Sequence, residues 1–333
     1  MKLVITGGAG FMGANFIRYV LRTYPNYRVV NFDKLTYAGN LDNLRDIEHD
    51  PRYAFVRGDI ADRAVVKKAF SGGTDMLVNF AAETHVDRSI MDPDAFLRTS
   101  VFGTHVLLEA AREQGVKKIL HVSTDEVYGS VPEGEASESS PYAPNSPYAA
   151  SKAAGDHLCR AHFTTYGTPV AVSHSCNFYG PYQYPEKVIP LFITNILEGK
   201  KVPLYGDGLQ VREWLHTEDA CRALDAILHR GKPGEVYNMG TGYRITNKEL
   251  TGKVLALLGK DESFVEPVKD RPGHDRRYAI SHDKLSRELG WQPEISFDDG
   301  LRRTVEWYRE NEGWWKKIKS REYLEYYKKQ YKQ

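Results

Sequence analysis

The feature that most constrains this chain is the glycine-rich loop Gly7-Gly8-Ala9-Gly10-Phe11-Met12-Gly13. It lies between an apolar, strand-like run at residues 3–6 and a helix-like run at residues 15–22. Glycines let a backbone turn tightly and approach a pyrophosphate, and the N-terminus of the following helix offers N–H groups and a positive dipole end. The order of strand, loop and helix therefore predicts a dinucleotide site.

Short apolar runs alternate with helix-like segments through the first half of the chain. Strands are expected at residues 3–6, 28–32, 53–57, 76–80 and 119–123, and helices at residues 15–22, 64–70 and 101–114. This alternation predicts an α/β fold with a Rossmann-type, doubly wound parallel sheet. After Gly180 the alternation fades. We therefore expect a cofactor-binding domain over residues 1–180, to which later segments return, and a smaller substrate-binding lobe over residues 181–333.

An acid at the end of the second expected strand bears on the identity of the cofactor. Asp33 lies about 20 residues after the last glycine, where a carboxylate binds the ribose 2′-OH and repels a 2′-phosphate. NAD is therefore expected rather than NADP. Gly58-Asp59-Ile60 follows the third strand and Phe80-Ala81-Ala82 follows the fourth. Because such sheets bind ligands at the C-terminal ends of their strands, both stretches are expected to border the cofactor.

Tyr148 and Lys152 lie four residues apart, after Ser146 and Pro147, which resemble an N-cap and a first helical residue. On a helix the two side chains share a face, and a nearby ammonium is expected to lower the pKa of the tyrosine. The phenolate is then a base for a substrate hydroxyl while a hydride leaves for the nicotinamide. The spacing alone is also that of an ordinary helix face, and the glycine loop favours the catalytic interpretation.

Two adjacent carboxylates follow the fifth expected strand, in Ser123-Thr124-Asp125-Glu126. A simple dehydrogenase needs only a hydroxyl here to orient its substrate, so Asp125 and Glu126 add an acid and a base. The alternative is a helix N-terminus with carboxylates that the helix dipole favours. These residues by themselves leave the two interpretations equally open.

Charge and cysteine content bear on partners and compartment. The chain has 45 Lys+Arg against 44 Asp+Glu, so neither nucleic acid nor a membrane surface is expected as a partner. The three cysteines are not at metal-ligand spacing, so no metal is expected, and a cytoplasmic location fits them. No signal peptide and no membrane span are expected. In the tail at residues 314–333, the aromatic side chains are expected to pack on the body with the lysines outward.

These motifs resemble those of the extended short-chain dehydrogenase/reductase superfamily, and within it the dTDP-glucose 4,6-dehydratases. The likeness runs from Leu3 to about Trp307. It includes residues 33–40, 81–89, 123–129, 179–187, 205–208, 211–216 and 270–278. Relatives that epimerise C4 of a sugar share the glycine loop and the Tyr148/Lys152 pair. They do not share the Asp125-Glu126 pair together with the stretch at residues 271–275.

The resemblance implies a three-stage reaction on dTDP-glucose. Tyr148, beside Lys152, takes the C4 hydroxyl proton while a hydride passes to NAD, and Thr124 holds that hydroxyl. Glu126 then removes the C5 proton and Asp125 protonates the departing C6 hydroxyl. The hydride finally returns to C6, which leaves a 4-keto-6-deoxy sugar. The resemblance also implies a homodimer packed through helices at residues 101–114 and 149–166.

Binding residues are implied by the same resemblance. The cofactor set is Gly7, Gly10, Phe11, Met12, Gly13, Asp33, Lys34, Leu35, Thr36, Asp59, Ile60, Phe80, Ala81, Ala82, Thr99, Tyr148 and Lys152. The substrate set is Thr84, Thr124, Asn177, Lys187, Val188, Pro203, Tyr205, Arg212, Asn247, Arg271 and His274. Phe178 stands where the family usually has a second asparagine, which puts one contact near the nicotinamide in question.

Several alternatives stay open on the sequence alone. A nucleotide-sugar 4-epimerase would invert C4 without losing water, and an NAD-sensing binding protein would have lost catalysis. Taken singly, Arg212 and Arg271 are equally open to being surface charges, and a lone histidine such as His274 is more often a structural histidine than a ligand contact. The sequence does not reveal the base of the nucleotide, and only the resemblance implies thymidine.

Overall fold

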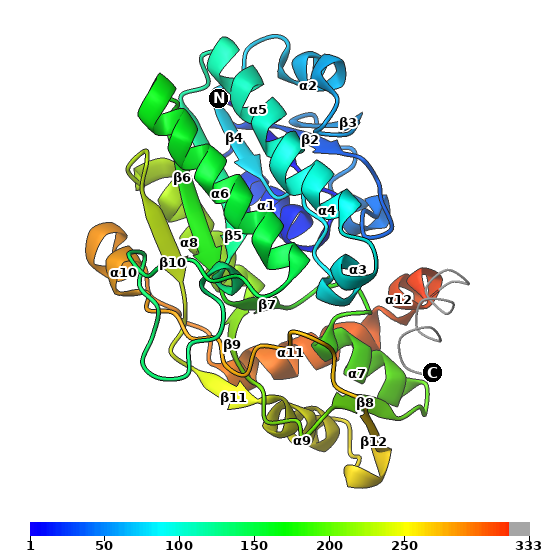
Figure 1. Cartoon of the computed structure of the whole chain (residues 1–333). Coiled ribbons are helices and arrows are strands. Elements are labelled where there is room, and N and C mark those ends of the chain that lie inside the picture. Colours follow the sequence, from blue (N-terminus) through cyan, green and yellow to red (C-terminus); the bar gives the residue numbers. More distant parts are fainter. Residues whose placement is uncertain (320–333) are drawn as a thin grey trace.

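The structure is a computed structural model, and it describes residues 1–319. Its centre is a seven-stranded parallel sheet with the strand order β10-β6-β5-β4-β1-β2-β3 (Figure 1). The strands are β1 (Lys2–Thr6), β2 (Arg28–Asp33), β3 (Tyr53–Arg57), β4 (Met76–Asn79), β5 (Lys118–Thr124), β6 (Val170–Ser175) and β10 (Val236–Met239). All five expected strands belong to this sheet, so the predicted doubly wound α/β fold is confirmed.

Helices cover both faces of the sheet. On one face lie α2 (Arg63–Phe70), α5 (Thr104–Glu113) and α6 (Pro147–Tyr166), and on the other lie α1 (Phe11–Thr23), α8 (Thr217–Arg230) and α10 (Asp283–Leu289) (Figure 1). The helix expected at residues 101–114 needs a correction. Residues 98–103 form a π-helix that follows α4 (Asp94–Leu97), and α5 begins only at Thr104.

The start of α6 shows how local chemistry places a catalytic candidate. The Ser146 hydroxyl accepts a hydrogen bond from the N–H of Ala149 at 3.1 Å, and Pro147 occupies the first turn, as the sequence predicts. The helix ends at Gly167, which has a φ of +67°. Tyr148 therefore stands in the first turn of a 20-residue helix that lies along the sheet.

A smaller layer of structure lies beyond the carboxyl ends of the strands (Figure 1). It contains the three-stranded sheet β11 (Arg244–Thr246), β9 (Val211–His216), β7 (Asn177–Tyr179) and the two-stranded sheet β12 (Val265–Val268), β8 (Val202–Tyr205). Around them lie α7 (Val188–Leu197), α9 (Asn247–Leu257), α11 (Phe297–Glu310) and α12 (Glu312–Ile318). These elements have their own hydrophobic core, centred on Tyr179, Trp214 and Tyr308.

Later segments return to the first unit, as expected. Both α8 and β10 come from beyond residue 180, and β10 adds the last strand to the central sheet by pairing with β6. In the aromatic tail, Trp315 is fully buried in the smaller core. Lys316 and Lys317 are exposed as expected, but Lys319 is 4% exposed and pairs with Glu198, so the expectation of outward lysines is wrong at that residue. Residues 320–333 lie outside the described residues.

Candidate active site

The glycine loop connects β1 to α1 at the point where the strand order reverses. In an open sheet this is where a crevice for a ligand forms. Gly7 has a φ of +67°, and a Cβ placed on it would lie 2.8 Å from the backbone N of Ala81. A Cβ on Gly13 would lie 2.3 Å from the carbonyl O of Gly7. The loop therefore accepts no side chain at either position, and its backbone forms the close cradle that a pyrophosphate requires.

Asp33 ends β2 beside this cradle. Its Oδ2 accepts a hydrogen bond from the N–H of Ala9 at 2.9 Å, and its Oδ1 accepts one from the N–H of Leu35 at 2.7 Å. The carboxylate is thus held against both the glycine loop and the segment after β2. Lys34 forms an ion pair with Asp59 at 2.9 Å. This arrangement fits the ribose end of NAD.

A single pocket runs from the glycine loop to Tyr148 and contains most of the predicted residues. All five catalytic candidates line it, and so does the whole cofactor set except Leu35, whose side chain lies outside. Of the substrate set, Thr84, Thr124, Asn177 and Lys187 line the pocket, whereas Val188, Pro203, Tyr205, Arg212, Asn247, Arg271 and His274 do not. Phe178, at the departure from the family pattern, also faces this pocket.

Several lining residues were not predicted. They come from strand ends and from the segment after β7, and they include Val122, Ser175, Cys176, Gln183, Tyr184 and Glu186. Residues 183, 184 and 186 lie within a motif that carries the family resemblance, so that motif was an available signal. Ser175 and Cys176 carry no such signal, because the end of a buried strand looks the same whether or not it borders a ligand.

The catalytic candidates converge at the carboxyl end of β5. Thr124 is the N-cap of a 3-10 helix, Asp125–Tyr128, and accepts a hydrogen bond from the N–H of Glu126 at 3.2 Å. Tyr278 donates a hydrogen bond to Glu126 Oε2 at 3.3 Å. Asp125 Oδ2 is buried and has no hydrogen-bond partner among residues 1–319. Asp125 and Glu126 therefore lie in the first turn of a short helix, which was the structural alternative given for them from the sequence. They also line the pocket, as the catalytic interpretation requires.

Burial affects the two carboxyl groups unequally. It raises the pKa of Asp125 well above its ordinary value, and the neighbouring charge of Glu126 raises it further. Burial also raises the pKa of Glu126, but Arg271, Arg212 and Lys187 oppose that shift with their positive charges. Of the two carboxyl groups, Asp125 therefore holds its proton more strongly, and Glu126 is the one whose ionised form nearby positive charge favours.

The predicted effect of Lys152 on Tyr148 is wrong. The pKa of Tyr148 is raised rather than lowered, because burial disfavours the phenolate and the negative charge of Glu126 adds to that effect. Lys152 Nζ donates a hydrogen bond to the carbonyl O of Val122 at 2.7 Å. The i, i+4 spacing placed both residues on one helix but gave no information about the burial of the phenol or the carboxylates near it.

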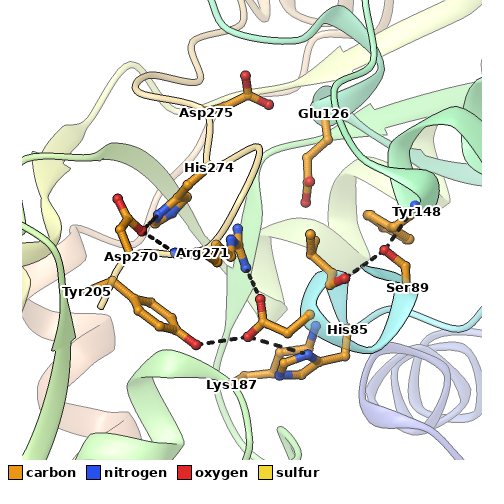
Figure 2. A network of polar contacts seen from close by, with 12 residues as sticks. His85, Ser89, Glu126, Tyr148, Lys187, Tyr205, Asp270, Arg271, His274 and Asp275 are labelled. Carbon is orange, nitrogen blue, oxygen red and sulfur yellow. Dashed lines mark hydrogen bonds and ion pairs between the residues drawn. The ribbon is translucent and has the colours of Figure 1, made fainter. Parts of the chain in front are cut away.

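A second cluster lies beside the pocket and gathers three of the predicted substrate residues. Tyr205 and Arg271 hydrogen-bond the same carboxylate, that of Asp87, at 3.0 and 2.9 Å (Figure 2). The rings of Tyr205 and His274 meet edge to face with their centroids 6.0 Å apart. Burial and the charge of Arg271 lower the pKa of His274 to about 4, so this histidine is neutral at pH 7.

The remaining substrate candidates are spread more widely. Arg212 is a buried side chain and not a surface charge: its guanidinium lies 4.1 Å from the centroid of the Tyr278 ring and donates to the carbonyl O of Asp275. Val188 begins α7 and Pro203 lies in β8. Asn247 begins α9, and its N–H donates to the carbonyl O of Gln210.

Within residues 1–319, no group of three or more His, Cys, Asp and Glu side chains is placed to hold a metal ion. None of the helices in this range is long and apolar enough to cross a membrane.

Comparison with known proteins agrees with this geometry. A family model described as GDP-mannose 4,6 dehydratase matches residues 4–304. The dTDP-glucose 4,6-dehydratase of Streptomyces antibioticus is 50% identical, and the alignment covers 96% of each chain. The crystal structure of DesIV, a dTDP-glucose 4,6-dehydratase from Streptomyces venezuelae with NAD bound, has a TM-score of 0.94, with 53% identity over 96% of this chain and 100% of that one.

Epimerases are more distant. The UDP-glucose 4-epimerase of Thermus thermophilus, in complex with NAD, has a TM-score of 0.86, with 33% identity over 93% of this chain and 100% of that one. The curated relatives near 50% identity and the structures with the higher TM-scores are dehydratases. The chain therefore belongs to the dTDP-glucose 4,6-dehydratase family of NAD-dependent, Rossmann-type enzymes.

Proposed function

We propose that this chain converts dTDP-glucose to dTDP-4-keto-6-deoxyglucose in the biosynthesis of a rhamnose-type deoxysugar. The observation that carries this proposal is the unequal pair Asp125 and Glu126 at the carboxyl end of β5. Loss of water from C5 and C6 needs a base and an acid that act on neighbouring atoms. Inversion of C4 needs neither, so the pair favours a dehydratase over an epimerase.

The cofactor set is proposed to hold NAD along the pocket, with the pyrophosphate on the glycine loop and the adenosine ribose at Asp33. Bound NAD would supply the hydride acceptor and donor for C4 and C6, and the positive charge of its nicotinamide would favour the phenolate of Tyr148, whose pKa burial raises in the chain alone.

Each proton transfer has a proposed residue. Tyr148 Oη takes the proton of the C4 hydroxyl, which the Thr124 hydroxyl orients. The resulting ketone makes the C5 proton acidic, and Glu126 removes it, then gives a proton back to C5 when the hydride returns to C6. Asp125 gives its proton to the C6 hydroxyl, which leaves as water. Lys187, Arg212 and Arg271 surround Glu126 with positive charge, and we propose that Arg271, with Tyr205 and His274 beside it, binds the diphosphate.

Product analysis tests this function. Purified protein given dTDP-glucose is expected to form a product with the alkali-induced absorbance of a 4-keto sugar and with no net build-up of reduced cofactor. NMR identifies that product as the 4-keto-6-deoxy sugar, or as a C4 epimer if the enzyme is an epimerase. Absence of turnover with dTDP-, UDP-, CDP- and GDP-hexoses alike would overturn the proposal and favour the binding-protein alternative.

A homodimer is proposed through the face formed by α4, the π-helix and α6. The support is a group of large apolar side chains exposed there: Leu97, Phe102, Phe163 and Tyr166. Light scattering in solution is expected to give twice the chain mass of 37.8 kDa.

A cytoplasmic location is also proposed, in line with three free, buried cysteines. We further propose residue 180 as the boundary between the NAD-binding domain and the substrate-binding lobe.

A further inference from the structure

Asp87 lies in α3 (Val86–Met91), the short helix that follows the cofactor-lining segment after β4. Its side chain is 4% exposed. Both carboxylate oxygens bind residues of the smaller lobe: Oδ1 accepts from Arg271 Nη1 at 2.9 Å and Oδ2 accepts from the Tyr205 hydroxyl at 3.0 Å. One buried side chain of the first unit therefore holds two residues that were predicted to bind substrate.

Asp87 also contacts His85 Nδ1 at 4.0 Å, and its two partners in the smaller lobe are brought together by neighbouring strands. Tyr205 ends β8, and Arg271 follows β12, which pairs with β8 in parallel register. Arg271 is further located by its own N–H, which donates to Asp270 Oδ1, and the same oxygen bonds His274 Nδ1. Asp87 therefore supports the corner of the small sheet that carries Tyr205, Arg271 and His274 (Figure 2).

The guanidinium of Arg271 has a donor left over. Arg271 Nε is buried and has no hydrogen-bond partner in the described chain. A guanidinium presents its N–H groups in a fixed planar fork, so holding Nη1 on Asp87 sets the direction in which the others point. Asp87 also supplies the negative charge without which a largely buried guanidinium is costly.

The same short helix also supports the catalytic tyrosine. The Ser89 hydroxyl accepts a hydrogen bond from the backbone N–H of Tyr148 at 3.2 Å and donates one to the carbonyl O of Val86 (Figure 2). Asp87 and Ser89 are two residues apart, so the one helix α3 contacts both Arg271 and the first turn of α6.

We propose that Asp87 is a positioning residue that aims Arg271 at the diphosphate of the nucleotide sugar, with the Tyr205 hydroxyl holding the carboxylate in place. This inference rests on the proposed function. Asp87 itself touches no reacting atom, and its effect reaches the substrate through Arg271. Loss of the Asp87 carboxylate is therefore expected to weaken nucleotide binding much more than it lowers the turnover rate of bound substrate.

The test replaces Asp87 by asparagine, which keeps the shape and removes the charge. With D87N, KM for dTDP-glucose and Kd for dTDP are expected to rise about 10- to 100-fold, the range for a hydrogen bond between charged groups. The value of kcat at saturating substrate is expected to stay within about threefold of the parent. Kd is measured by calorimetry on NAD-loaded protein, so binding is read independently of turnover.

Matched variants keep the test sharp. Asp207 forms an ion pair with Arg276 at 2.9 Å on the exposed side of the same lobe, and Asp207→Asn is expected to leave KM and Kd unchanged. Tyr205→Phe removes only the hydroxyl and is expected to raise KM by less than D87N. In an Arg271→Lys background, D87N is expected to add little, because the fork that Asp87 orients is already gone.

The outcomes are distinguishable. Parent protein that binds none of dTDP, UDP, CDP or GDP overturns the proposed function and this inference together. Parent protein that binds one of them, with a D87N Kd within about twofold, overturns only the positioning role. Equal losses in kcat and in thermal stability, without a selective rise in KM, show a merely structural role and also overturn it.

Discussion

The indole N–H of Trp314 donates a hydrogen bond to Asn43 Oδ1 at 2.8 Å, although the two residues are 271 positions apart. Asn43 Nδ2 in turn donates to the carbonyl O of Ala9 at 2.9 Å, inside the glycine loop. The side chain of Asn43 is thus shared between the C-terminal helix α12 and the pyrophosphate cradle. The end of the described chain supports the backbone that is proposed to hold NAD.

We predict that Trp314→Phe weakens NAD binding about 2- to 10-fold, the range for one lost hydrogen bond. The phenyl ring keeps an aromatic side chain against Tyr182 and Trp307, and the buried oxygen of Asn43 loses its donor. The measurement is cofactor content after purification, followed by a fluorescence titration. Lys317→Ala removes an exposed ion pair to Asp42 nearby and serves as the control, with unchanged NAD binding expected.

We predict that Gly13→Ala abolishes stable NAD binding. The added Cβ would lie 2.3 Å from the carbonyl O of Gly7, and the backbone on both sides cannot yield without opening the cradle. Gly252, in α9, is the matched control: nothing lies within 4 Å of a Cβ there, and Gly252→Ala is expected to be neutral or to stabilise by about 0.5–1 kcal/mol. An NAD-loaded Gly13→Ala protein would contradict the proposed cradle.

We predict that Asp125→Asn and Glu126→Gln each lower kcat by about 10²- to 10⁴-fold, because each removes one proton transfer of the elimination. With Asp125→Asn, Glu126 still removes the C5 proton. NMR in D₂O is therefore expected to show deuterium at C5 of the sugar without loss of water. Glu126→Gln is expected to show neither. An epimerase would keep most of its activity in both variants.

We predict a bell-shaped dependence of kcat on pH. Glu126 must be ionised, and burial raises its pKa, so the rate falls on the acid side at a higher pH than an ordinary carboxylate would give. Asp125 must keep its proton, and its pKa lies well above the ordinary value because of burial and of Glu126, so the rate falls again as the pH rises through that pKa. The pH profile of kcat for Asp125→Asn checks this assignment. The residual kcat of the variant is expected not to fall at alkaline pH. A fall like that of the parent protein would mean that another group causes the alkaline limb.

Local chemistry accounts for what the sequence predicted correctly. The glycine loop and the Ser146 cap each depend on residues a few positions apart, and Asp33 was predicted from its place at the end of the second strand; the structure contains all three. The family motifs extended this to most of the pocket lining. Asp87 lies within one of these motifs, but its role was missed because its partners Tyr205 and Arg271 lie 118 and 184 positions away.

Short-range periodicity and backbone sterics were enough to predict the doubly wound sheet, the cofactor loop and the groups available for chemistry. The electrostatic surroundings of those groups depend on the folded structure. The pKa of Tyr148 is raised although Lys152 lies on the same helix, and Arg271, Arg212 and Lys187 oppose the rise in the pKa of Glu126 that burial causes. The reason is physical: the energy of a charge depends on the water it loses and on the charges that folding brings near it, and neither quantity is local in sequence.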